Sequence, residues 1–186
     1  MDRTPDNHED IVDYLQRQHT EIRALFAEVA KTTGEHRRDR FRELVRLLAV
    51  HETAEELVVH PAVRDLTGGK KLAEARLGEE HRAKELLSTL DKLGPGRDGF
   101  DTLLEQLRED VLAHAEHEER DEFPLLRKKL SAERRRAMAS TAKTAESIAP
   151  THPHPGVEGS TANLLLGPPV AIVDRARDAI RSALNR

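Results

Sequence analysis

Three histidines stand in rows where a helical protein would normally place apolar side chains. They are His19, His51 and His114. Each follows an apolar residue of its row by three or four positions, and those residues are Leu15, Leu48 and Val111. Residues at this spacing share one face of a helix, so the three imidazoles are predicted to point inward. Because a buried polar group without a partner costs several kcal/mol, roughly 2 to 7, each imidazole needs a partner inside the protein.

Two of these histidines begin the same short motif. His51 is followed four residues later by Glu55, and His114 is followed four residues later by Glu118. Each glutamate therefore lies on the same inward face as its histidine. Imidazole and carboxylate are the ligands that iron, manganese and zinc accept when no thiolate is present, and the chain has no cysteine. Carboxylates can also bridge two cations, so the pattern predicts a two-metal site.

The motifs fall near the middle of long segments with helical period. Four such segments are predicted, at residues 7–32, 35–60, 70–93 and 98–130. Aromatic residues make up only 3% of the chain, while strong helix formers such as Ala, Leu and Glu are abundant. Short turns between the segments favour an all-α, antiparallel up-down four-helix bundle. Mid-helix residues then meet at one level, whichever way each helix runs.

The third segment contributes the weakest candidate. His81 is its only histidine, and it is included because the other three helices already converge. It lies outside the main apolar row, and only Leu77 clearly shares its face. Of the remaining histidines, His60 precedes Pro61 and is predicted to be structural or to line the mouth of the site. The others are predicted to be solvated, exposed or in a linker, and they are His8, His36, His117, His152 and His154.

The remainder of the chain differs in composition from the predicted bundle domain of residues 7–130. A further helix is predicted at 131–149, followed by a Pro/Gly-rich linker at 150–169. The last segment, 170–186, is predicted to form an amphipathic C-terminal helix. Its apolar face consists of Val173, Ala176, Ile180 and Leu184. We expect this extension to pack on the bundle, on a second copy or on a protein partner.

Composition narrows the function classes. The absence of cysteine excludes disulfides, zinc-thiolate sites and iron–sulfur clusters. The net charge of -4 argues against a nucleic-acid partner. No apolar run approaches the roughly 20 residues that a membrane span needs, and the polar N-terminus does not resemble a signal peptide. A cytoplasmic protein is therefore expected.

Together these residues resemble the hemerythrin HHE cation-binding family. The matching pieces are His19, His51-Glu52-Thr53-Ala54-Glu55, His81, His114 through Glu119, and Phe123-Pro124. The resemblance covers about residues 7 to 130, and the overall composition and tail look like actinobacterial members. The complete series of motifs is fairly specific, whereas either short motif alone is not.

The resemblance implies a non-heme di-iron centre bridged by Glu55, Glu118 and an oxo or hydroxo group. It suggests that His19 and His51 bind one iron, and that His81 and His114 bind the other. Some members, such as the F-box hemerythrins, also use a carboxylate directly after the histidine of the second helix, and Glu52 matches that position. Glu85 is a fallback ligand. Zinc or manganese remain alternatives to iron.

One departure from oxygen-carrying hemerythrins affects the expected reactivity. Those proteins carry an extra His-x-x-x-His pair on the third helix, whereas here His81 is followed four residues later by Glu85. More anionic donors favour ferric iron, and reaction with hydrogen peroxide or nitric oxide over reversible oxygen binding. The predicted function is therefore a di-iron protein that reacts with or senses small oxidants, with enzymatic consumption left open. The alternative is an iron-responsive or structural metal-binding interaction module without catalysis.

The single tyrosine has two interpretations. Tyr14 lies five residues before His19. It is either a residue at the edge of the core or a hydrogen-bond or redox partner of the site.

Overall fold

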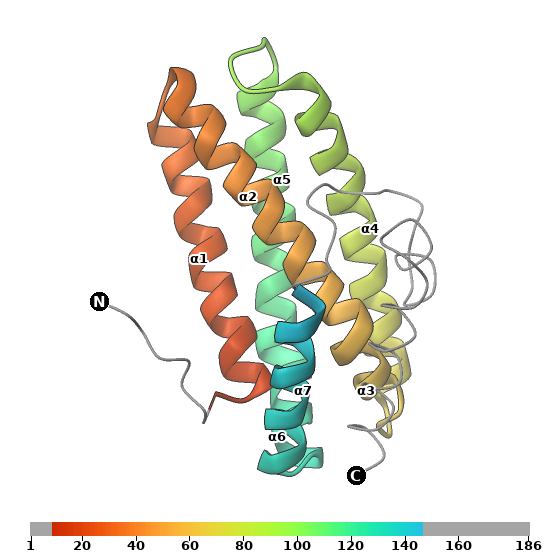
Figure 1. The fold of residues 1–186 in the computed structure, drawn as a ribbon. Helices are drawn as coiled ribbons and strands as arrows, with labels where there is room; N and C mark the ends of the chain where they lie inside the picture. Colours follow the sequence, from red (N-terminus) through yellow and green to blue (C-terminus); the bar gives the residue numbers. More distant parts are fainter. Residues whose placement is uncertain (1–8, 147–186) are drawn as a thin grey trace, which may run out of the picture.

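Four long antiparallel helices form the body of the molecule (Figure 1). The structure is a computed structural model and describes residues 9–146. The long helices are α1 (Ile11–Lys31), α2 (Gly34–Ala54), α4 (Gly69–Leu93) and α5 (Phe100–His117). Helix α1 packs beside α2, and α4 packs beside α5. The predicted all-α up-down bundle is confirmed, and no strand occurs among residues 9–146.

Local signals in the sequence set the ends of these helices. Asp10 caps α1, because its carboxylate accepts hydrogen bonds from the N–H groups of Val12 and Asp13 at 2.9 and 3.2 Å. The side chain of Asp13 accepts one in return from the N–H of Asp10, which completes a capping box. Gly94 follows α4 with a backbone φ of 77°, a conformation that residues other than glycine rarely adopt.

Two π-helical turns interrupt the second and fourth long segments. The turns and the helices that follow them are η1 (Glu55–Val59), α3 (His60–Arg64), η2 (Glu118–Glu122) and α6 (Phe123–Lys129). At the end of η1, His60 donates its N–H to the carbonyl of Glu55, five residues back, directly before Pro61. The same arrangement precedes Pro124. Proline lacks an N–H and clashes with the carbonyl four residues back, so a wider turn lets each helix continue.

Helix α7 (Ala132–Glu146) lies against α1, α2 and η1. Met138, Ala139 and Ala142 are buried on the face that it turns toward the bundle. Two ion pairs fasten it to the start of α1: Arg135 to Asp10 at 2.7 Å, and Lys143 to Glu9 at 2.9 Å. The predicted helix at 131–149 thus matches α7 as far as residue 146. The predicted linker at 150–169 and helix at 170–186 lie outside the described residues.

The apolar core is divided in two. One cluster surrounds Leu15, Phe123 and Leu126, and the other surrounds Phe26 and Leu107. Between them lies a layer of buried histidines and glutamates. The two apolar clusters therefore enclose this polar layer midway along the bundle. Within residues 9–146, no helix combines the length and apolar character that crossing a membrane would require.

Candidate metal centre

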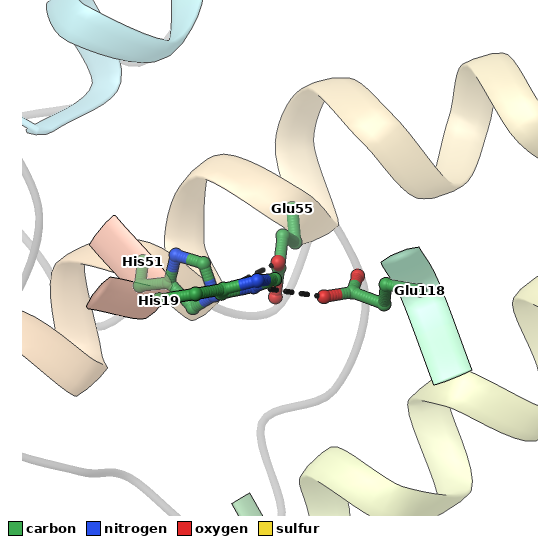
Figure 2. A group of neighbouring side chains, drawn as sticks. All are labelled: His19, His51, Glu55 and Glu118. Carbon is green, nitrogen blue, oxygen red and sulfur yellow. Dashed lines mark ion pairs between the residues drawn. The ribbon is translucent and has the colours of Figure 1, made fainter. Parts of the chain in front are cut away.

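Four side chains from separate turns of the bundle meet in the polar layer. They are His19 from α1, His51 from the last turn of α2, Glu55 from η1 and Glu118 from η2 (Figure 2). His19 Nε2 lies 3.2 Å from Glu118 Oε2, and His51 Nε2 lies 3.0 Å from Glu55 Oε1. Two donors that bind one ion at about 2.1 Å and at right angles are themselves about 3.0 Å apart. The spacing therefore suits donors of one shared cation.

A second group adjoins the first. Glu55, His60 and Glu80 also place donor atoms within 4.8 Å of one another. Glu55 belongs to both groups, so its two oxygens could bridge two cations. His114 faces both groups, because its Nε2 lies 3.7 Å from Glu55 Oε2, 3.6 Å from Glu118 Oε2 and 4.0 Å from Glu80 Oε1.

Charge is the clearest sign that cations belong here. Glu55, Glu118 and Glu122 are fully buried and Glu80 is 2% exposed. None of the four forms an ion pair with lysine or arginine among residues 9–146, and both carboxylate oxygens of the first three lack a hydrogen bond. Burying one unpaired carboxylate is already costly, and four in one layer require compensating positive charge. Two divalent cations would balance the four carboxylates, so the residues present fit a two-metal centre.

The carboxyl groups titrate far from their usual range. Burial raises the pKa of Glu118 to about 8, and the nearby charge of Glu55 adds to this effect. Burial, with the charge of Glu118, raises the pKa of Glu122 to about 7. Burial would also raise the pKa of Glu55, but the imidazoles of His51 and His114 outweigh it and hold that pKa well below its usual value. Without a cation, Glu55 is thus ionised near neutral pH, while Glu118 is largely protonated.

Two histidines carry the balancing positive charge in the metal-free protein. Burial would lower the pKa of His60, but the carboxylate of Glu80 outweighs it and raises that pKa to about 9. Burial is likewise overcome at His114, where Glu118 and Glu55 hold the pKa well above its usual value. A metal cation needs neutral imidazoles and ionised carboxylates, so its binding must release these protons.

Outer residues fix the orientation of three imidazoles. Each ring donates its Nδ1–H to an acceptor away from the centre, which leaves Nε2 pointing inward. The pairs are His19 with Glu119 at 2.8 Å, His51 with Gln18 at 2.9 Å, and His114 with Glu79 at 3.1 Å. Gln18 in turn donates from Nε2 to the hydroxyl of Tyr14 at 3.0 Å. The single tyrosine is thus buried and connected to His51 through one residue.

A small cavity of about 20 Å³ adjoins the centre, enough for one water-sized molecule. Part of its wall is formed by His19, His51, His114 and Glu55. The rest of the wall is mostly apolar and comes from Ile22, Leu48, Ala83, Val111, Leu112 and Ala115. The cavity therefore has room beside the centre for a molecule of one or two heavy atoms.

The Hemerythrin HHE cation binding domain family matches residues 10–126 of the chain. The chain belongs to this family. It is 32% identical over 138 residues to an uncharacterized hemerythrin-like protein of Schizosaccharomyces pombe, covering 70% of this chain and 66% of that protein. It is 28% identical over 138 residues to a DNA nickase of Nostoc, covering 74% of this chain but only 39% of the nickase.

A solved structure agrees in fold. The crystal structure of a hemerythrin HHE cation binding domain-containing protein from Mycobacterium kansasii superimposes with a TM-score of 0.66 at 20% identity. The match covers 90% of this chain and 99% of that one. The family match confirms the predicted resemblance, and the superposition agrees with it in fold. The structure also shows where each predicted site residue of this hemerythrin-like domain lies.

Glu52 lies beside the two donor groups without belonging to either. Its carboxylate is buried, lines the cavity and is 3.7 Å from the ammonium of Lys84. Burial raises the pKa of Glu52 to about 8, although Lys84 opposes the shift. Lys84 also contacts Glu56, so this hemerythrin-like domain has a second buried polar network next to the donor groups.

His81 lies away from the donor groups, contrary to its predicted place. Its side chain is 42% exposed, and Nε2 lies 3.5 Å from Glu85 on the same outer face of α4. The buried residues of α4 instead recur mostly at spacings of three and four, and they include Ala73, Arg76, Glu80, Ala83, Lys84, Leu87 and Leu90. Neither His81 nor the fallback Glu85 is therefore near the centre.

Three buried residues of the hemerythrin-like centre were not predicted as ligands. Glu80 could have been found from the sequence, because it lies three residues before Ala83 and seven before Leu87 in an inward row. His60 and Glu122 had no such signal. Each lies beyond or at the end of a π-helical turn, which shifts the register of the inward face by one residue.

Proposed function

We propose that this hemerythrin-like domain binds two non-heme iron ions and reacts with or senses a small oxidant, with hydrogen peroxide first among oxygen, peroxide and nitric oxide. The observation that carries the proposal is the group of four buried carboxylates that have no lysine or arginine partner within residues 9–146 and that face four buried imidazoles. Only nitrogen and oxygen donors are present, which suits iron, manganese or zinc. The high share of carboxylates favours iron in its ferric state over reversible oxygen carriage.

The two donor groups suggest how the ions are held. We assign one ion to His19, His51, Glu55 and Glu118, and the second ion to His60, Glu80 and His114. Glu55 and Glu118 would be shared between the two ions. Glu122, fully buried beside Glu118 in η2, completes the anionic side of the second position.

The surrounding residues would shape the reaction. Iron held by these residues would supply the redox chemistry: two electrons and two protons would convert one peroxide into water, and a second peroxide would return two electrons and two protons as it leaves as oxygen, so that no other reductant is needed. Glu119, Gln18 and Glu79 hold the imidazole rings in the orientation that keeps Nε2 available. The small cavity would hold a molecule of one or two heavy atoms, such as hydrogen peroxide, and its mostly apolar wall would limit the access of bulk water to the centre.

A second candidate function is an iron-responsive interaction module without catalysis. One observation favours it: α7 packs directly on η1, the turn that supplies Glu55. A cation that orders η1 would therefore also change the surface on which α7 packs. The DNA nickase among the relatives extends well beyond the matched region, and we propose no nucleic-acid partner for this chain.

Metal analysis and peroxide consumption distinguish the candidates. Protein purified without added iron should contain two iron ions per chain and show an oxo-to-iron charge-transfer band. It should consume peroxide, and His114→Ala should abolish this activity, whereas His36→Ala on the exposed start of α2 should not. Two iron ions without peroxide consumption would support the interaction module. Zinc alone, with no optical band, would contradict the proposed redox chemistry.

A further inference from the structure

The cavity beside the donor groups has one polar wall residue that the proposed ions do not use. Among residues 9–146, six polar side chains line the cavity, and they are His19, His51, Glu52, Glu55, Glu80 and His114. Five of them are assigned to the two ions, and the sixth is Glu52. The remaining wall is apolar. A molecule held in the cavity therefore has Glu52 as its polar contact apart from the ions and their ligands.

The carboxyl group of Glu52 has an unmet capacity for hydrogen bonds. The residue is 7% exposed, so its side chain is almost cut off from bulk water. Within the part of the chain that the structure describes, this carboxyl group makes no hydrogen bond, and its one ion pair is with Lys84 at 3.7 Å. Because a buried polar group without a hydrogen bond is costly, a partner held in the cavity would stabilise it.

Lys84 draws Glu52 away from the ions. It lies on α4, four residues after Glu80, and its ammonium contacts both Glu52 and Glu56. Glu52 belongs to neither group of donor atoms that lie within 4.8 Å of one another. An ammonium at this position competes with a metal cation for the same carboxyl group. Glu52 is therefore placed at the cavity, beside the centre rather than within it.

Hydrogen peroxide is the oxidant whose chemistry fits this wall. It carries two O–H groups, whereas oxygen and nitric oxide carry none. A carboxylate accepts a hydrogen bond from a peroxide O–H, and a protonated carboxyl group donates one to a peroxide oxygen, so Glu52 can bind peroxide in either form. The cavity also has room for a molecule with two heavy atoms.

We propose that Glu52 binds hydrogen peroxide in this cavity and thereby selects it over oxygen and nitric oxide. The inference rests on the proposed reaction of the centre with a small oxidant. It gives Glu52 a direct contact with the substrate in place of the metal-ligand role that the family resemblance suggested.

Substitutions of Glu52 in the iron-loaded, full-length protein test the proposal. Glu52→Leu removes the hydrogen-bonding group, so the KM for peroxide should rise at least about tenfold, with a smaller change in kcat. Glu52→Gln keeps the shape and still forms hydrogen bonds without the charge, so its KM should rise only about threefold. Because its shape is unchanged, Glu52→Gln tests the proposal even where leucine disturbs folding.

Glu56→Gln is the matched control. Glu56 is the other buried carboxyl group that contacts Lys84, but it does not line the cavity. The same chemical change at this position should therefore leave the KM for peroxide within about twofold of its original value.

Two further measurements separate peroxide binding from metal ligation and from a structural role. Both Glu52 variants should retain two iron ions per chain after desalting. Nitric oxide binding to the reduced protein, followed by absorbance without oxygen, should be as tight as in the unaltered protein or tighter. The reason is that nitric oxide has no O–H group for Glu52 to bind.

The outcomes distinguish this inference from the proposed function. Loss of an iron ion in both Glu52 variants would make Glu52 a metal ligand and overturn the inference. An unchanged KM with two ions bound would also overturn it, since Glu52 would then contact only water. Equal weakening of nitric oxide and peroxide binding would overturn the proposed selectivity. Iron-loaded, unaltered protein that consumes no peroxide would contradict the proposed function itself, whereas the other outcomes leave that function standing.

Discussion

A single position on α4 decides which residue reaches the centre. Glu80 is 2% exposed and touches His60, whereas its neighbour His81 points outward with 42% of its side chain exposed. Successive residues on a helix are turned by about 100°, so Glu80 and His81 do not both point toward His60. The domain thus has a carboxylate at this point of α4 where a histidine was predicted, which makes the centre richer in anionic donors.

Replacing His60 by alanine should reduce the number of bound iron ions, whereas replacing His81 by alanine should not. His60→Ala removes a buried imidazole that contacts Glu80, so the protein should bind one iron ion fewer per chain. His81→Ala removes only an exposed pair with Glu85, so two ions should still bind. Metal content per chain after reconstitution and desalting measures both outcomes. If His81→Ala lost an ion and His60→Ala did not, the assignment of the second position would be wrong.

The sequence predicted the centre best where a histidine stood in a well-formed apolar row. His19, His51 and His114 meet this condition, and the structure brings all three together with Glu55 and Glu118. His81 was chosen by elimination, without a row to support it. The row of α4 is marked by alanines as much as leucines, and alanine is a weak signal because it is common on both faces of helices.

At the scale of elements, the two halves of the centre are built in the same way. A histidine, two glutamates and a proline recur at equal spacing in residues 51–61 and 114–124, and a π-helical turn lies between the glutamate and the proline in both. The helices continue past both prolines, because the backbone absorbs each proline by one wider turn. Its local cost must be offset by contacts elsewhere, which sequence patterns do not reveal.

Pro61→Ala should test whether this wider turn serves the centre. Alanine restores an N–H at position 61, so the ordinary α-helical hydrogen bond to the carbonyl of Leu57 becomes available. We expect the turn to tighten, His60 to rotate away from Glu80, and iron affinity at the second position to fall at least about tenfold. Titration with ferrous iron under anaerobic conditions measures this affinity.

The helix signal in circular dichroism serves as the control for Pro61→Ala, because it should not decrease. An unchanged affinity together with intact helix content would show that the proline does not position His60. Pro124→Ala, which removes the equivalent proline after η2, provides the matched comparison on the other half of the centre.

For the whole molecule, the four-helix fold follows from helical periods that run the full length of each segment. The polar layer, in contrast, does not follow from the pattern of any single segment. It joins groups from α1, α2, η1, α3, α4, α5 and η2, and its energetics depend on how many charges share one dry space. A single residue's pattern therefore indicates that it is buried, but only the assembled bundle shows which charges it must share.

This shared charge predicts an unusual pH dependence for the metal-free protein. The pKa values of Glu118, Glu122 and His60 are raised to about 8, 7 and 9, so the folded state holds protons that the unfolded chain has already released. Stability from such groups is complete below the unfolded pKa and is lost as pH rises through the folded pKa. His19 opposes the trend, since burial lowers its pKa, but it is one group against several. The free energy of unfolding should therefore fall by at least about 2 kcal/mol between pH 5 and 9.

Bound iron should remove or reverse this trend, because the cations replace the protons and bind more tightly as pH rises. Urea unfolding at several pH values, with a chelator and with two equivalents of iron, measures both curves. Glu118→Gln provides the control: it removes one titrating carboxyl from the layer, so the metal-free curve should become flatter. A metal-free protein that grows more stable from pH 5 to 9 would contradict the shared-charge account, since its buried carboxylates would then already be compensated by other groups.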